Sequence, residues 1–318
     1  MKKITMCLVG CSLALMMVLS GCVQEGSRLD AIPDDAVKVT PETDILPPIL
    51  QVSGWGDPIP MEGPVNTAGG EDSAFITPDA QTFYFFFTPD VSVPANEQLT
   101  DGYTGIWQSH WNQGSWSEPE RVVLTTTIGL DGAQFVLDDT LWFASARLGN
   151  FGELDYYTAE LVDGEWKNWQ NAGQLLNAVY DIGELHISRN GQLMYYDGQG
   201  SSSSDLYILE ANGSSWGEPV ALPAPINTDE FDESRPYVNA DGSELWYTST
   251  SRLGYPGPAI FRSVRLQNGS WGEPVEVVSQ FAGEPSLDDD GNLYFTHHFF
   301  DEQMNMIEAD IYVCYALD

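Results

Sequence analysis

Carboxylates at the starts of predicted β-strands are the residues of this chain whose type and spacing could do chemistry. The polar residues that stand where the first strand of a repeated unit begins are Glu71, Asp72, Gln134, Glu184, Glu233, Arg235 and Glu284. Two carboxyl groups on either side of a glycosidic bond can act as acid and base. Asp72, Glu184 and Glu233 come from three different units. They are therefore the candidate catalytic residues if the protein is a hydrolase.

The same ring of residues also fits two roles without catalysis. Carboxylates beside aromatic rings suit sugars or protein surfaces, and an oxygen-rich ring suits Ca2+. The candidate ligand-binding residues are Glu71, Gln134, Arg235, Glu284, His297 and Phe299. A purely structural role is the third possibility, because strand-start acids can accept hydrogen bonds from loop amides. The main expectation is a binding or scaffold module without enzymatic activity, and a glycoside hydrolase is the alternative.

A repeated unit of four short strands positions these residues. Its second strand follows a turn that recurs in the sequence at Asp79-Ala80, Asp139-Thr140, Asn190-Gly191, Asp241-Gly242 and Asp290-Gly291. An aromatic or apolar triplet follows each turn, and a Trp opens the fourth strand in four of the units, at Trp116, Trp166, Trp216 and Trp271. A repeat of this length with tight hairpins is typical of a β-propeller blade.

The last unit lacks its fourth strand, because the chain ends soon after Tyr315. Ser53-Gly54-Trp55-Gly56-Asp57-Pro58 near the other end matches Ser215-Trp216-Gly217-Glu218-Pro219, and Val65-Asn66-Thr67 matches Ile226-Asn227-Thr228. We therefore expect an all-β fold, a five-bladed β-propeller over residues 51–318 with four antiparallel strands per blade. The N-terminal strand completes the C-terminal blade, which leaves no open sheet edge.

The first residues read as a targeting signal. Lys2-Lys3 precede an apolar run that is too short to be trusted as a membrane span. Leu19-Ser20-Gly21-Cys22 resembles the lipobox of prokaryotic lipoproteins. The resemblance implies that residues 1–21 are a signal peptide and that Cys22 carries lipid. Residues 22–50 are polar and contain four prolines, so we expect a flexible tether. We therefore expect an exported protein that is anchored by lipid at the cell envelope.

The amino-acid composition limits the classes of molecule that this chain can bind. The net charge is −35, with 12 Lys and Arg against 47 Asp and Glu, and a chain this acidic repels nucleic acid. We expect a monomer that binds a protein or glycan and meets the membrane through its anchor alone. Only Cys314 would remain besides Cys22, so neither an internal disulfide nor a Cys-based metal site is expected.

The best-formed unit carries a family resemblance. Asn227-Thr228, Glu233, Asp241-Gly242, Leu245-Trp246-Tyr247 and Ser251-Arg252 resemble the WD40-like repeat of the TolB type, called PD40. The resemblance implies a propeller fold for residues 51–318. It implies little about activity, since such propellers serve as scaffolds, as accessory domains and, in relatives, as enzymes. The first and third units lack the Ser-x-Arg of the pattern.

Overall fold

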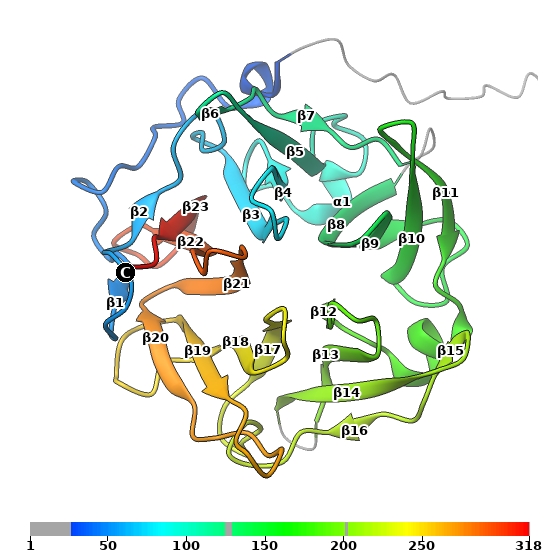
Figure 1. The fold of residues 1–318 in the computed structure, drawn as a ribbon. Coiled ribbons are helices and arrows are strands. Elements are labelled where there is room, and N and C mark those ends of the chain that lie inside the picture. Colours follow the sequence, from blue (N-terminus) through cyan, green and yellow to red (C-terminus); the bar gives the residue numbers. More distant parts are fainter. Residues whose placement is uncertain (1–26, 125–128, 201–202, 318) are drawn as a thin grey trace, which may run out of the picture.

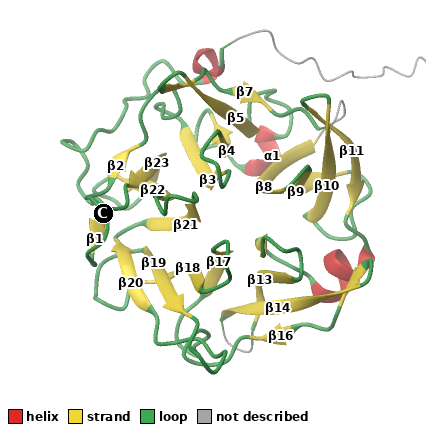
Figure 2. Ribbon diagram, in the orientation of Figure 1, coloured by secondary structure: helices red, strands yellow, loops and turns green. Residues whose placement is uncertain are grey.

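A computed structural model describes residues 27–124, 129–200 and 203–317, and its antiparallel strands form blades arranged in a ring (Figure 1). The centre of the ring, between the innermost strands, is called the channel below. Almost all regular structure is strand, and the helical segments are short (Figure 2). They are η1 (Arg28–Ala31), α1 (Ala95–Gln98) and η2 (Leu175–Tyr180). Among the residues described, no helix is long and apolar enough to cross a membrane.

The first three blades follow the chain from the innermost strand outward. Blade one contains β3 (Gly70–Ile76), β4 (Thr82–Thr88), β5 (Gly105–Asn112), β6 (Ser115–Trp116) and β7 (Glu120–Arg121). Blade two contains β8 (Gly129–Leu137), β9 (Thr140–Arg147), β10 (Asp155–Val162) and β11 (Glu165–Asn171). Blade three contains β12 (Leu185–Ile187), β13 (Leu193–Gln199), β14 (Ser204–Asn212), β15 (Ser215–Trp216) and β16 (Val220–Ala221).

The last two blades take strands from both ends of the chain. Blade four contains β17 (Glu233–Val238), β18 (Glu244–Thr250), β19 (Pro258–Val264) and β20 (Val275–Ser279), with β1 (Ile49–Leu50) added outside. Blade five contains β21 (Ala282–Leu287), β22 (Leu293–Phe300) and β23 (Met306–Cys314), and its outer strand is β2 (Ile59–Pro60). The predicted five-bladed propeller is confirmed.

Ring closure follows the predicted plan. Ile59 pairs with Val313, and Trp55 forms a further bridge to Ala316. Asn66 donates from Nδ2 to the carbonyl of Ile311 and accepts from the Ile311 amide through Oδ1. Asn227 makes the same pair of hydrogen bonds to Leu206 on β14. The N-terminal residues therefore complete blade five with the contacts that a continuous chain uses in blade three.

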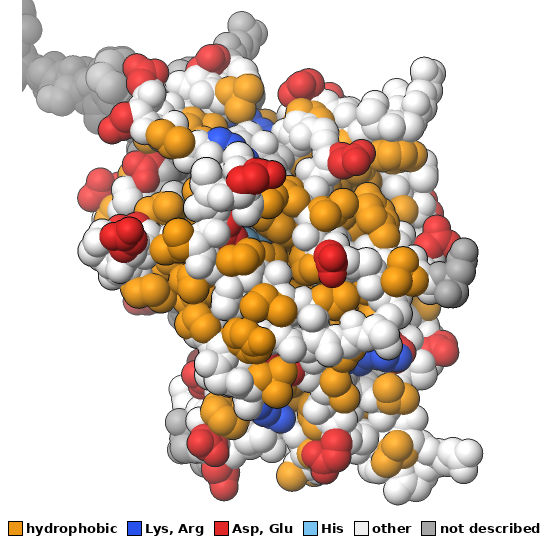
Figure 3. Space-filling view, turned by 90° about the vertical axis from the view of Figure 1, so that its left-hand side faces the viewer, with side chains coloured by type: hydrophobic (Ala, Val, Ile, Leu, Met, Phe, Trp, Pro, Cys, Tyr) orange, Lys and Arg blue, Asp and Glu red, His pale blue; other side chains and the backbone are white. Residues whose placement is uncertain are grey.

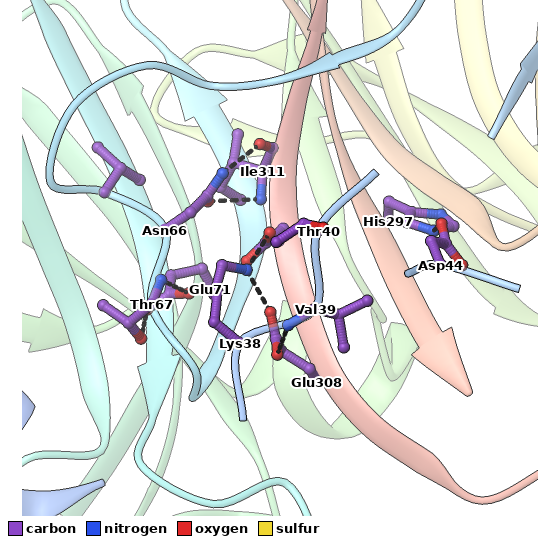
Figure 4. A network of polar contacts seen from close by, with 12 residues as sticks. Lys38, Val39, Thr40, Asp44, Asn66, Thr67, Glu71, His297, Glu308 and Ile311 are labelled. Carbon is purple, nitrogen blue, oxygen red and sulfur yellow. Dashed lines mark hydrogen bonds and ion pairs between the residues drawn. The ribbon is translucent and has the colours of Figure 1, made fainter. Parts of the chain in front are cut away.

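The prediction of a flexible tether is wrong for residues 27–50, which we call the N-terminal strap. They lie against the ring, because three charged side chains of the strap contact buried polar side chains on blades one and five. Figure 4 shows the contacts of Lys38 and Asp44. The three strap residues that make these contacts are Arg28, Lys38 and Asp44. Its apolar side chains Ile32, Val39 and Leu50 pack against the cores of the neighbouring blades. The strap is therefore held in one conformation, although it is rich in prolines and polar residues.

Four of the innermost strands carry a β-bulge where they meet the channel. Each bulge holds one non-glycine residue at positive φ, namely Ser73 at 53°, Ala133 at 47°, Arg235 at 51° and Glu284 at 59°. Such bulges redirect side chains and gather near functional sites. The innermost strand of blade three, β12, has no such register shift. The bulges therefore aim Arg235 and Glu284 at the channel.

The outer rim differs from the channel in character. Figure 3 shows the side of the ring that carries β1, β2 and the C-terminal end, where apolar side chains gather between scattered carboxylates. Exposed apolar residues of these blades include Ile59, Val264 and Val275. Cys314 is fully buried in the core of blade five.

A carboxylate cluster at the channel mouth

An aromatic layer closes the channel and makes it a blind pocket. Phe75, Phe135, His186 and Tyr237 come from four blades, and the ring of His186 lies 4.4 Å from those of Phe135 and Tyr237. The Tyr237 hydroxyl donates to the carbonyl of Leu287 on blade five, over 2.7 Å. Small cavities of about 50 and 40 Å³ lie on the two sides of this layer. A ligand can therefore reach the strand-start residues from one face only.

Arg235 is the central side chain of the pocket. Its Nε lies 2.5 Å from Glu284 Oε1 and 3.1 Å from Glu184 Oε1. The three residues come from blades four, five and three, so one guanidinium joins three sheets. Arg235 remains 40% exposed, while Glu284 is 7% exposed. The cation therefore neutralises carboxylates at the mouth and still faces the solvent.

Asp197 at the end of β13 holds the backbone beneath this ion pair. Its two carboxylate oxygens accept from the Glu184 amide at 3.0 Å and from the Arg235 amide at 2.7 Å. Gly183 makes this possible, because a Cβ at that position would stand 1.9 Å from Asp197 Oδ1. One carboxylate thus sets the positions of two residues of the pocket.

Asp72, Glu284 and His298 form the other half of the cluster. Glu284 accepts from the Ser73 amide at 2.6 Å and from the Thr296 hydroxyl at 3.1 Å. The charge of Asp72 also acts on the Glu284 carboxyl group. His298 Nε2 lies 3.6 Å from Asp72 Oδ1. Asp72 therefore lies between a carboxyl group and an imidazole, next to the ion pair of Arg235.

The surroundings shift the two most exposed carboxyl groups in opposite directions. Burial raises the pKa of Glu184 to about 7, with Arg235 opposing this shift and the charges of Asp197 and Asp72 adding to it. Burial also acts to raise the pKa of Asp72, but His298 outweighs it and the pKa lies below the ordinary value. Near neutral pH the cluster therefore contains one ionised carboxylate and one carboxyl group that exchanges its proton readily.

The pKa values of three neighbouring side chains are shifted as well. Burial, then the charge of Asp72, raise the pKa of Glu284 well above its ordinary value. The pKa of Arg235 is raised by Glu184 and Glu284. Burial lowers the pKa of His186 to about 3, so this ring is neutral in the aromatic layer. The charge of Asp72 thus opposes the ionisation of Glu284, and the charge of Arg235 favours it.

The structure brings together five of the predicted site residues. Asp72, Glu184, Arg235 and Glu284 form the cluster, and Gln134 lines the same pocket, where its amide donates to the carbonyl of Ser73. All five were predicted at strand starts, and Arg235 and Glu284 are themselves the positive-φ residues of their bulges.

Glu233 and Glu71 lie elsewhere, and this corrects the predicted catalytic trio. Glu233 is fully buried; it accepts from the Thr228 amide and hydroxyl and pairs with Arg252. Glu71 is also fully buried and accepts from the amide and hydroxyl of Thr67. Both carboxylates hold the loop before their own strand, because they stand two residues ahead of the bulge.

His297 and Phe299 also point away from the pocket. His297 Nε2 lies 3.0 Å from Asp44 of the strap, and its Nδ1 contacts the carbonyl of Phe281. Phe299 is 1% exposed and packs against His297 and Tyr312. The expected ligand contacts of these two residues are therefore replaced by core packing.

The contribution of Asp197 was not predicted from the sequence, and His297 was predicted as the site residue, whereas His298 is the one that lies beside Asp72. Asp197 stands where the repeat has Ser145 in blade two and Ser249 in blade four, so its departure from the repeat was a usable signal. No cluster of three or more possible metal ligands occurs among the described residues. Arg235 stands among the carboxylates where a cation was expected, and Ca2+ binding stays a prediction. The signal peptide and Cys22 lie outside the described residues.

The comparisons with known proteins concern the fold. No family model and no curated protein matches the sequence. The catalytic domain of a GH62 alpha-L-arabinofuranosidase from Coprinopsis cinerea matches with a TM-score of 0.51 and 12% identity over 78% of this chain and 90% of that domain. Bacteroides ovatus "Xyloglucan PUL GH43B" matches with 0.50 and 12% over 80% of this chain and 53% of that one. At these identities the likeness shows a shared β-propeller fold.

TolB from Acinetobacter baumannii is also among the similar structures, with a TM-score of 0.44 and 13% identity. The match covers 79% of this chain but spans only 55% of TolB. Because no family model matches, the TolB-type repeat stays a prediction, and the shared propeller fold rests on the GH62 structure above.

Proposed function

We propose that the channel mouth hydrolyses a glycosidic bond, with Asp72 as the base and Glu184 as the acid. The observation that carries this proposal is the opposite shift of two carboxyl groups in one cluster. Each is about one third exposed, at 34% for Asp72 and 33% for Glu184. Two titratable groups whose surroundings separate their pKa values are the usual arrangement of an acid and a base.

The roles follow from the protonation states. Glu184, with a pKa of about 7, can give its proton to the leaving oxygen near neutral pH. Asp72 stays ionised and can activate water or stabilise the positive charge that develops on the sugar ring. Arg235 and Asp197 keep Glu184 in place, and Glu284 accepts from the amide of Ser73, the residue after the base. The third acid of the predicted trio is thus replaced by Glu284.

The likeness of fold agrees with this proposal. The solved structure with a TM-score of 0.51 is named as an alpha-L-arabinofuranosidase, so the five-bladed ring is a framework that such chemistry can use. The substrate is expected to be a neutral glycan, because the net charge of −35 repels anionic polymers.

The test is hydrolysis of neutral oligosaccharides and of aryl glycosides with leaving groups of different acidity. Glu184→Gln should lower kcat by about 10²–10⁴-fold on oligosaccharides. It should lose less on aryl glycosides whose leaving group needs no proton, because only the acid role is removed. Asp72→Asn should lose activity on both substrate types.

Asp289→Asn is the matched control, since this carboxylate pairs with Arg189 far from the cluster and is 53% exposed. It should keep wild-type rates and an unchanged melting temperature. A wild-type protein that cleaves none of the substrates, or a Glu184→Gln variant with full activity on oligosaccharides, would contradict the hydrolase.

Binding without chemistry is the second candidate, and the state of Arg235 favours it. The guanidinium lies across Glu184 and Glu284, and the cavity beneath it is only about 50 Å³. A scaffold that holds a glycan or a protein on this face would need no deeper space. Thermal melting with the same sugars separates the candidates, because a ligand that is bound and not cleaved raises stability without releasing product.

The place of action is proposed from the sequence. The lipobox-like Leu19-Ser20-Gly21-Cys22 supports export and a lipid anchor at the cell envelope. Mass spectrometry of the mature chain checks this: a lipid on an N-terminal Cys22 is expected, and Cys22→Ser should release the protein from membranes.

A further inference from the structure

We infer that the N-terminal strap positions Asp72 and His298, so that residues outside the propeller repeat hold the proposed base in place. The inference rests on the proposed function for its catalytic consequence. It rests on contacts alone for its structural part. On two strands, one residue binds the strap and the next residue in the sequence belongs to the Asp72–His298 pair of the carboxylate cluster.

The first of these strands is β3. Arg28 of the strap is 4% exposed, and its Nη1 donates to Glu71 Oε1 over 2.7 Å. Its Nη2 donates to the carbonyls of Pro64 and Val65, and the guanidinium lies over the rings of Phe85, Phe87 and Trp107. Successive side chains of a strand point to opposite faces. Fixing Glu71 therefore fixes where Asp72 points.

The second strand is β22. Asp44 of the strap is 2% exposed and lies 3.0 Å from Nε2 of the fully buried His297 (Figure 4). The next residue, His298, faces Asp72 across the seam between blades five and one. The strap thus fastens the residue before the base and the residue before its imidazole partner.

The other blades show why the strap is needed. Blade two pairs Asp131 with its own Arg147, and blade four pairs Glu233 with its own Arg252. Blade one lacks the Ser-x-Arg of the repeat, and Arg28 takes the place of that arginine beside Glu71. In blade five, Lys38 pairs with Glu308 and Asp310, and the Val39 amide donates to Glu308 (Figure 4). The strap therefore supplies cations to blade one, which carries Asp72, and to blade five, which carries His298.

Blade two provides a matched control within the same chain. Arg147 makes the same kind of buried ion pair and lies over the rings of Tyr157 and Trp169. The residue after its partner Asp131 is Gly132, which has no side chain to place in the pocket. Loss of Arg147 should therefore disturb a blade without moving the base.

The experiment compares Arg28→Ala, Asp44→Asn and Arg147→Ala in the whole chain, at a temperature where melting shows each to be folded. The first readout is the ring signal of His298 in ¹H–¹³C NMR spectra, assigned with His298→Gln. The chain contains four His residues, so the signals can be resolved. Arg28→Ala and Asp44→Asn should move the His298 signal, Arg147→Ala should leave it in place, and Arg28→Lys should restore it in part.

The second readout is kcat with the best oligosaccharide substrate. Arg28→Ala should lower kcat about tenfold with little change in KM, since a small misplacement of a reacting group costs this much or more. An unmoved His298 signal in both strap variants, or an equal shift in Arg147→Ala, would overturn the inference. If no substrate is cleaved, the NMR result still decides the positioning, and only the hydrolase fails.

Discussion

Asp72 and Glu184 show how the same functional group acquires different properties at two positions in one pocket. His298 stands beside the first, while burial and two neighbouring acids act on the second. Both side chains were predicted at strand starts, but their protonation states depend on residues from other blades. A sequence can therefore nominate the pair, and only the assembled ring assigns the two roles.

The pH dependence of turnover should follow Glu184. A general acid must be protonated, so kcat should be constant below pH 7 and fall about tenfold per pH unit above it, since the pKa of Glu184 is raised to about 7. Because the pKa of Asp72 lies below its ordinary value, activity should persist to a lower pH than an unshifted Asp would allow. A profile that rises through pH 8 would contradict the assignment of the acid.

Gly183 should tolerate no side chain. The Cβ of Gly183→Ala would stand 2.7 Å from the Asp197 carbonyl oxygen and closer still to its carboxylate. Asp197 would then release the amides of Glu184 and Arg235. We expect a loss of about 2–3 kcal/mol in unfolding free energy, measured by urea denaturation. Gly56→Ala is the comparison, because its nearest neighbour would be 3.8 Å away and its stability should change little.

At the level of elements, the strands were predictable and the bulges were not. Turn residues such as Asp241-Gly242 and the aromatic triplets follow local rules of hairpins. The positive φ of Arg235 and Glu284 is imposed by the meeting of five strands at the channel, which no local pattern encodes. For the same reason Glu233 was assigned to the pocket, although it lies two residues before the bulge and faces its own loop.

The clasp between the two chain ends, by which we mean the two hydrogen bonds of Asn66 with Ile311 on β23, should contribute measurably to stability. Asn66→Ala removes two hydrogen bonds to Ile311 and leaves its amide and carbonyl without these partners. We expect a loss of about 1–3 kcal/mol in unfolding free energy. Asn227→Ala removes the equivalent pair in blade three. Equal losses would show that the joined ends are as strong as a continuous blade, and no loss in Asn66→Ala would show that the clasp adds nothing.

The whole molecule carries a large negative charge, and its buried acids respond to pH in one direction. Burial raises the pKa values of Glu184, Asp197, Glu233, Glu284 and Asp310. An acid whose pKa is higher in the folded state than in the unfolded chain stabilises the fold at low pH, and this stability is lost as pH rises through the folded value. Repulsion among the surface acids grows over the same range.

The melting temperature should therefore be higher at pH 5.5 than at pH 8 in low salt. Added NaCl should raise the value at pH 8 more than that at pH 5.5, because salt screens repulsion between exposed charges. Differential scanning calorimetry at both pH values, with and without 0.5 M NaCl, measures this. A melting temperature that increases with pH would mean that the buried acids do not control stability.

The joining of the two chain ends also dictates when the protein can become complete during its synthesis. Lys38 and its partner Asp310 are 272 residues apart, and β2 pairs with the last strand of the chain. The strap can therefore make its contacts with blade five only after residue 310 has been synthesised. Contacts this distant in sequence form slowly. The proposed base, which depends on them, would be assembled only in the finished ring, so a truncated chain would have no working site.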